Sequence, residues 1–296
     1  MFAVYLFSYA ELYLVPGLVC LAILLFAGRK LLSTTLLAPI FWCGLSVVGA
    51  GSAFRYVYGS QADGVYYRYL AAVLLIAPTL ALLGAKRPQN GAWQFIVLTL
   101  VGVLLLPVMQ GWLFGDQQPH VHLLFRWVIV THILIGVVNY LPTRYAAPAL
   151  FFGATQTLIS AEYFPFALPQ VARLWPITLW CLCASLIWAS VAARRTRLTP
   201  GLDRLWLDFR DAYGLVWGLR IAERLNASAQ KHGWPVEFTW GGMIVREGAE
   251  LDAETRHRVE REMRSHLRRF VSHDWIAARL PDSPSARPLT GARGSE

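Results

Sequence analysis

The sequence predicts a membrane all-α fold: a seven-helix transmembrane bundle, N-terminus out and C-terminus in, followed by a small C-terminal α+β cytoplasmic domain. Seven apolar stretches fill the first two-thirds of the 296 residues, and the positive charges between them fall on alternate sides. The chain then becomes polar and changes its periodicity. We therefore predict a seven-span bundle in residues 1–197, a helix–hairpin–helix domain in 198–280 and a disordered tail in 281–296.

Most of the apolar stretches are close to the ~20 residues that a helix needs to cross a hydrocarbon core. They run from Phe2 to Gly28, Thr35 to Phe54, Tyr67 to Gly84, Ala92 to Phe114, Val121 to Leu141, Tyr145 to Ile159 and Leu174 to Ala193. The sixth is short for a span.

The loop charges predict the orientation. With the N-terminus outside, the cytoplasmic segments carry Arg29, Lys30, Lys86, Arg87, Arg144, Arg194, Arg195 and Arg197. The other side has Asp63, Asp116, Glu162 and Arg173. Lys and Arg are retained at the cytoplasmic ends of spans, so we expect seven crossings. The first basic residues follow the first apolar stretch, so we expect that stretch to remain in the mature protein.

The net charge of +9 does not indicate a nucleic-acid partner. Residues 1–198 hold 12 Lys and Arg against 4 Asp and Glu, whereas residues 199–296 hold 15 against 14. The excess therefore belongs to the membrane loops, and the polar region has no basic face for phosphate backbones. Only three lysines accompany 24 arginines, which suggests a GC-rich bacterial genome and hence an inner-membrane location.

The region after the bundle contains two helical patterns around a hairpin pattern. From Leu202 to about Gln230 apolar residues recur every three or four positions, and Trp206 and Trp217 widen that face. Residues 236–240 alternate in the manner of a strand, and Gly241-Gly242 suits a tight turn. Asp252 is the expected N-cap of a helix that runs to His273.

The aromatic face of the first tail helix must be buried. The candidates are the membrane interface, the cytoplasmic ends of the bundle, or a membrane-protein partner. Gly214 and Gly218 either allow another backbone to approach closely or break the helix.

The fifth apolar stretch has a polar side. At 100° per residue, His122, Arg126, His132 and Asn139 fall within an arc of about 140°. Ionisable groups at membrane depth are costly unless they face protein or water, so this side should point into the bundle. These residues either hold helices together by hydrogen bonds or form an intramembrane polar track, through His132 and Asn139, for an ion, a proton or a ligand.

Three arginines are expected in the outer half of the membrane, where the charge rule predicts few. Arg55, Arg68 and Arg126 come from three spans, and Glu11 and His122 are predicted neighbours. Asp63, Asp116 and Glu162 are other available carboxylates. These acids and arginines either pair structurally or form an anion site, because guanidinium groups bind phosphate and carboxylate through two parallel hydrogen bonds.

Several other chemistries do not fit the sequence. His120 and His122 lie on different helix faces, and no other span carries a histidine for a haem pair. The seventh stretch has no lysine for a retinal Schiff base, and residues 48–53 lack the strand–loop–helix context of a dinucleotide fingerprint. The cysteines, Cys20, Cys43, Cys181 and Cys183, all lie in apolar stretches and are predicted to pack. We expect no metal and no cofactor.

The sequence therefore predicts a non-catalytic subunit or scaffold of a membrane complex in the bacterial inner membrane, with a periplasmic N-terminus. Membrane lipids and a membrane-protein partner that contacts the tail helix are the expected partners. The alternative is a transporter or membrane enzyme that handles an anionic lipid phosphate or carboxylate at the arginine cluster.

Overall fold

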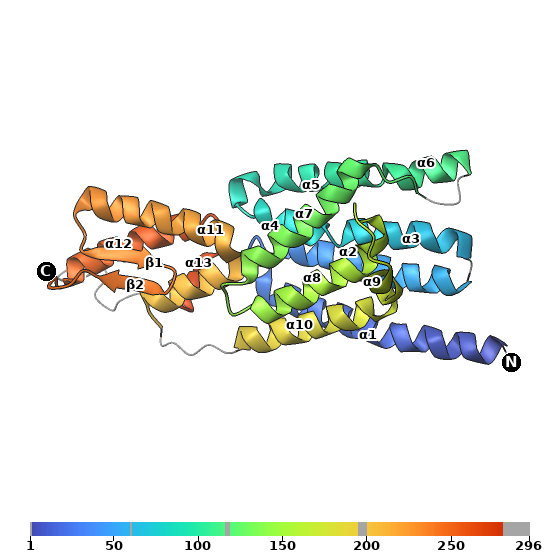
Figure 1. The fold of residues 1–296 in the computed structure, drawn as a ribbon. Coiled ribbons are helices and arrows are strands. Elements are labelled where there is room, and N and C mark those ends of the chain that lie inside the picture. Colours follow the sequence, from blue (N-terminus) through green and yellow to red (C-terminus); the bar gives the residue numbers. More distant parts are fainter. Residues whose placement is uncertain (1, 60, 116–118, 195–199, 281–296) are drawn as a thin grey trace, which may run out of the picture.

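The computed structural model shows a mostly helical chain with two parts that lie end to end (Figure 1). The structure describes residues 2–59, 61–115, 119–194 and 200–280, and the side chains of residues 2–12, 55–59, 61–63 and 88 lie outside this description. The predicted tail in residues 281–296 also lies outside it. We call residues 2–194 the bundle and residues 200–280 the tail domain.

The bundle consists of α-helices that run along its long axis, with short 3₁₀ turns between some of them. They are α1 Phe2–Leu31, α2 Leu37–Gly59, α3 Gln61–Leu74, α4 Ala77–Leu83, η1 Arg87–Gln89, α5 Asn90–Leu104, α6 Leu106–Phe114, α7 Leu123–Tyr140, α8 Ala146–Ser160, η2 Ala161–Tyr163, α9 Pro169–Arg173, η3 Trp175–Ile177 and α10 Thr178–Arg194.

Six helical segments among the described residues are long and apolar enough to cross a membrane. They are Tyr13–Leu31, Leu37–Phe54, Gly64–Leu83, Asn90–Phe114, Leu123–Tyr140 and Trp175–Arg194. The outward surface is apolar too, with Phe95 70% exposed on α5. The chain is therefore an integral membrane protein. The six do not include α8, whose 15 residues span only about 22 Å.

A proline breaks the third apolar stretch into α3 and α4. Pro78 lies in the first turn of α4 and has no amide hydrogen to donate to the preceding turn. Side chains from other helices bind the carbonyl groups at the break: Ser46 Oγ donates to Leu74 O (2.8 Å) and Gln156 Nε2 donates to Leu75 O (2.7 Å). A broken helix persists at membrane depth only where such groups are satisfied within the protein. The small helix α6 also has a proline, Pro107, in its first turn.

The tail domain has the predicted two-stranded hairpin between helices. It comprises α11 Leu202–His232, β1 Val236–Thr239, β2 Gly242–Val245, α12 Ala253–Leu267 and α13 His273–Ala277. The strands are antiparallel, with Val236 opposite Val245. The Asp252 side chain caps α12 by accepting a hydrogen bond from the amide of Thr255 (2.7 Å). The helix predicted to run to His273 is α12, and it ends six residues earlier, at Leu267. The chain then turns and enters α13.

The aromatic face of α11 is covered mainly by the tail domain itself, rather than by the membrane interface, the bundle or a partner alone. Trp206, Phe209 and Tyr213 are fully buried, and their rings pack against Phe238 of β1 and Phe270 after α12. The hairpin and α12 fold back across α11 because their own apolar sides also need cover. Beyond Tyr213 the face continues onto the bundle.

Candidate functional site

Arg68 lies on α3 at the end of the bundle away from the tail domain. The residue is only 8% exposed, and it forms an ion pair with Glu162 of η2. Its guanidinium also lies 5.7 Å from the centre of the Trp175 ring, a favourable cation–π distance. Glu162 is one of the carboxylates that the sequence offers as a partner, and this pairing matches the structural interpretation of the arginine.

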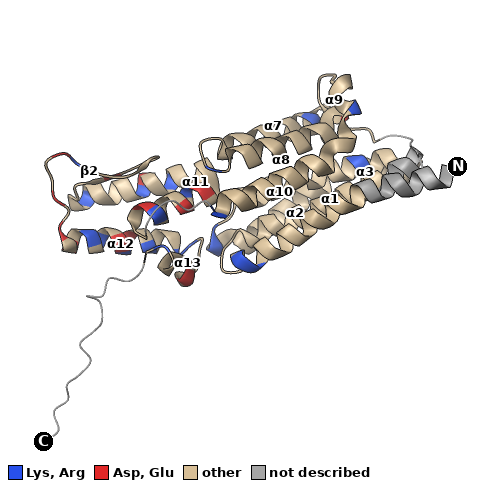
Figure 2. Cartoon of the chain, turned by 90° about the horizontal axis from the view of Figure 1, so that it is seen from below, with Lys and Arg blue, Asp and Glu red and all other residues tan. Residues whose placement is uncertain are grey.

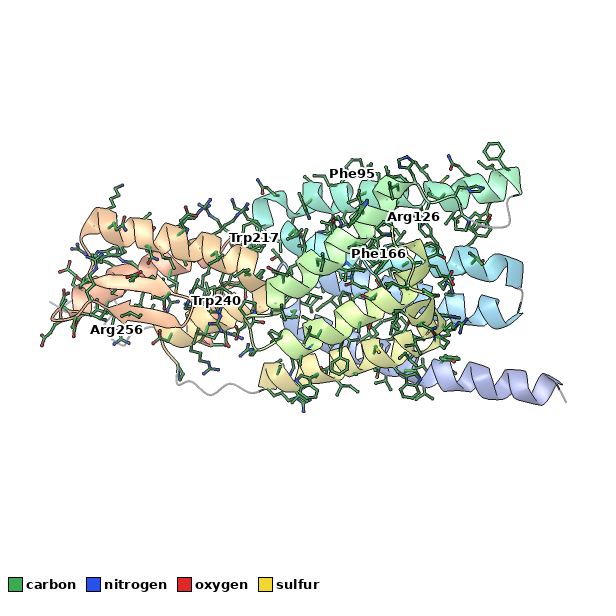
Figure 3. All side chains as sticks on the ribbon, in the orientation of Figure 1. Phe95, Arg126, Phe166, Trp217, Trp240 and Arg256 are labelled. Atoms are coloured by element: carbon green, nitrogen blue, oxygen red, sulfur yellow. The ribbon has the colours of Figure 1, made fainter. Side chains whose placement is uncertain are left out.

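Arg126 lies in the first turn of α7 at the same end of the bundle (Figure 3). Its Nε donates to Val121 O (3.1 Å) and its Nη1 donates to Phe164 O (3.3 Å). These acceptors are neutral carbonyl groups, so they do not cancel the charge of the guanidinium. Glu162 pairs with Arg68 and Phe164 accepts one of the two hydrogen bonds of Arg126, so the fold brings both arginines to one short segment.

The remaining members of the predicted anion site are not all placed. The side chains of Arg55 and Glu11 lie outside the described residues, as does that of Asp63. His122 is exposed and caps α7, where its Nδ1 accepts a hydrogen bond from the amide of Leu124 (3.2 Å). Convergence of the three arginines on one cavity stays a prediction.

The polar side of α7 has three separate groups of partners. His132 Nδ1 lies 2.7 Å from Val128 O within the same helix. Asn139 is buried at the opposite end of α7 from Arg126, and its Oδ1 accepts a hydrogen bond from the amide of Val216 in α11 (3.0 Å). The described contacts therefore do not join these residues and Arg126 into one path. Asn139 instead connects the bundle to the tail domain.

Two polar residues of α8 are missed by the sequence analysis. Gln156 and Ser160 are 1% exposed, and Gln156 Oε1 and Ser160 Oγ have no hydrogen-bond partner among the described residues. Arg68 Nε, on the neighbouring α3, is also buried and has no hydrogen-bond partner within the part of the chain that the structure describes. Their spacing could have indicated them in the sequence, because residues four apart lie on the same face of a helix.

These groups define what the far half of the bundle can do chemically. A guanidinium, an amide and a hydroxyl can bind water or an anion, and each buried polar atom left unpaired costs roughly 1–3 kcal/mol. The described residues contain no group of three His, Cys, Asp or Glu that could hold a metal ion.

The junction between the bundle and the tail domain is the most extensively bonded polar region. Tyr140 Oη donates to Ala212 O (3.0 Å), and Trp240 Nε1 donates to Pro142 O (2.9 Å). Thr35 Oγ1 lies 3.1 Å from Tyr213 Oη, whose pKa is raised by burial, so this phenol is neutral. Segments from three parts of the bundle thus meet α11 and the hairpin.

A buried ionic cluster reinforces this junction. Asp208 and Asp211 of α11 are about 5% exposed. Arg144, in the loop after α7, contacts Asp208 Oδ1 (2.9 Å) and Asp211 Oδ2 (3.5 Å). From the tail domain, Arg279 Nε contacts Asp208 Oδ2 (2.8 Å). Arg144 is a predicted topogenic residue, and the structure gives its charge a second role.

Comparison with protein-family models, with curated proteins and with solved structures finds no match to this chain.

Proposed function

We propose that the chain is a seven-span protein of the bacterial inner membrane that serves as a non-catalytic subunit or scaffold of a membrane complex. The observation that carries this proposal is the junction. Hydrogen bonds and ion pairs from the α1–α2 loop, α4, the end of α7 and the α7–α8 loop hold the tail domain. A domain fixed in this way presents its outer surfaces in a constant orientation, as a scaffold requires.

Seven crossings with a periplasmic N-terminus are supported by the packing of α8. This helix contacts α7, α10 and α3, and it lies among the candidate spans (Figure 1). Arg144 precedes it at the tail-domain end, whereas Glu162 follows it at the far end. A crossing here keeps the basic loops on the side of the tail domain.

Purification of the full-length protein in a mild detergent tests the scaffold role. We expect a protein partner in a stoichiometric amount, and we expect Trp217→Phe with Asn139→Ala, which removes two junction hydrogen bonds, to reduce its recovery. Arg256→Gln on the exposed face of α12 is the matched control and should retain the partner. Purification without any stoichiometric protein contradicts the scaffold role.

The second candidate function is handling of an anionic substrate, such as a lipid phosphate, at Arg126. It is favoured by the neutral acceptors of Arg126 and by the unpartnered buried groups on α3 and α8. Arg126→Ala should then abolish retention of an endogenous anionic lipid and leave a near-normal yield of folded protein. The control is Arg173→Ala at the end of α9. Loss of folded protein without a separate loss of binding favours the scaffold role.

A further inference from the structure

Basic side chains of the tail domain lie beside the loop that joins α4 to α5. Trp217 Nε1 donates to Leu82 O (3.1 Å), and the amide of Arg87 donates to Arg269 O (2.7 Å). The loop is thus held between α11 and the end of α12. Leu82 is near the end of one candidate span, and Arg87 precedes the start of the next. This contact region therefore lies at the level where the hydrocarbon core ends.

Two arginines of α11 share the helix face that meets this loop. The guanidinium of Arg220 lies 5.4 Å from the centre of the Trp217 ring. At 100° per residue, Arg220 and Arg224 lie within about 60° of Trp217 around the helix. Both residues are exposed, so their charges face solvent.

A third arginine, from the end of α12, joins this face. Burial lowers the pKa of His266, Glu262 opposes that effect, and the positive charges of Arg224 and Arg269 add to the lowering. Arg224 of α11 and Arg269, two residues after the end of α12, therefore both act on one imidazole. We call Arg87, Arg220, Arg224 and Arg269 the basic junction.

Membrane insertion does not account for most of these charges. Arg87 belongs to a loop between spans, but the other three belong to the tail domain, and folding of that domain joins the Arg269 carbonyl to the Arg87 amide. Glu223 and Glu262 are acidic residues of the same region, and Glu262 is already bound by Ser228 Oγ (3.0 Å) and by His266. Like charges gathered on an exposed surface repel one another unless an anion is present.

The place of the basic junction identifies the anion. Phe95 projects outward from α5 with 70% of its surface exposed, and Trp217 marks the boundary between bundle and tail domain (Figure 3). Figure 2 shows further basic residues at the end of α1 that faces the tail domain, where Arg29 and Lys30 lie in the last turn. The region is therefore a basic surface at the height of lipid headgroups.

We propose that the basic junction binds the phosphate headgroups of anionic phospholipids at the membrane surface on the side of the tail domain. Guanidinium groups bind phosphate through paired hydrogen bonds. Each basic residue near an anionic membrane strengthens association about fivefold. This inference goes beyond the scaffold role and depends only on the membrane position of the chain. It is also separate from the Arg126 site, which lies at the other end of the bundle.

Native mass spectrometry of the full-length protein tests the proposal by titration with phosphatidylglycerol and, separately, with phosphatidylcholine of the same acyl chains. We expect tighter binding of phosphatidylglycerol and a decrease in that preference as the salt concentration rises. The triple variant Arg220→Gln, Arg224→Gln and Arg269→Gln should reduce the affinity for phosphatidylglycerol by about tenfold or more. It keeps the carbonyl of residue 269 that binds the loop.

The control removes three charges from the outer part of the same domain. Arg256, Arg258 and Arg261 are exposed on α12, and Arg256 lies far from the bundle (Figure 3). Their replacement by Gln should leave the lipid preference unchanged. Arg→Lys substitutions at the three junction positions keep the charge but lose the paired hydrogen bonds, so they should retain part of the preference, and they also report on folding. Equal binding of the two lipids by the parent, or equal losses in the test and control triples, overturns the proposal. Full competition by inorganic phosphate alone would also overturn it, since that identifies a free-anion site.

Discussion

Asn139 of α7 and Gly214 of α11 fit against each other at the junction of the two parts. Gly214 has φ 76° and ψ −169°, which interrupts the helical backbone of α11. A Cβ atom at this position would lie 2.2 Å from the side-chain Nδ2 of Asn139 and 2.8 Å from the backbone carbonyl oxygen of the same residue. Asn139 Oδ1 accepts a hydrogen bond from Val216, just beyond the kink. The kink and the amide thus form one contact between bundle and tail domain.

We expect Gly214→Ala to destabilise the protein. The backbone region of Gly214 is essentially restricted to glycine, and occupation by another residue costs about 1–3 kcal/mol before the steric clash is added. The thermal unfolding midpoint in detergent should fall, measured by circular dichroism. Gly201→Ala is the control, because φ is 165° there and no atom lies within 4 Å of the added Cβ. A Gly214→Ala variant as stable as the parent would show that the kink does not exist.

Replacement of Asp208 by Asn should weaken the junction more than replacement of an exposed acid. It removes the charge that Arg144 and Arg279 share, and those arginines keep only 25% and 23% of their side chains exposed. Breaking one partner of a buried ionic cluster costs several kcal/mol, and we expect up to about 3 kcal/mol here. Glu254→Gln, at an exposed pair with Arg258, should cost less than about 1 kcal/mol. Denaturant titration of both variants measures the difference.

His266 should make the tail domain less stable in mild acid. Burial and the charges of Arg224 and Arg269 lower its pKa below 6.5 despite the opposing effect of Glu262. The unfolded chain therefore binds a proton more tightly, so folding stability falls as pH decreases through about 6.5. His266→Gln should flatten the pH dependence of the thermal midpoint between about pH 7 and pH 5. His257→Gln removes an exposed imidazole from the same helix and should not; equal flattening by both would exclude His266 as the cause.

The proposed topology predicts the locations of reporter fusions. A reporter after Arg197 should report the cytoplasm, and one at the N-terminus should report the periplasm, because eight basic residues lie in segments assigned to the cytoplasm. Alkaline phosphatase and green fluorescent protein provide opposite signals and control for expression. A periplasmic signal from the fusion after Arg197 would exclude seven crossings.

Much of the local structure follows from the sequence because it depends on neighbours along the chain. The apolar stretches are long enough to require helices, and Asp252 caps the helix that follows the hairpin. The hairpin forms where it is predicted, but its two-residue turn is Trp240-Gly241 rather than Gly241-Gly242, because Gly242 pairs with Thr239 at the start of β2. At Gly214 the sequence leaves two interpretations open, close approach and helix breaking, and the structure has both. Sequence length does not decide whether the sixth stretch crosses the membrane, because its helix, α8, has only 15 residues and is shorter than the other spans.

The sequence by itself determined that this chain has membrane-spanning helices and a small polar domain, since hydrophobic length and periodicity are local properties. Only the tertiary structure decided which groups meet. It paired Arg68 with Glu162, separated Asn139 from the other polar residues of α7, and covered Trp206 and Phe209 with the tail domain's own residues. Such contacts join residues far apart in the chain, and many alternative partners satisfy the same charge or apolar face, so spacing along the sequence does not select among them.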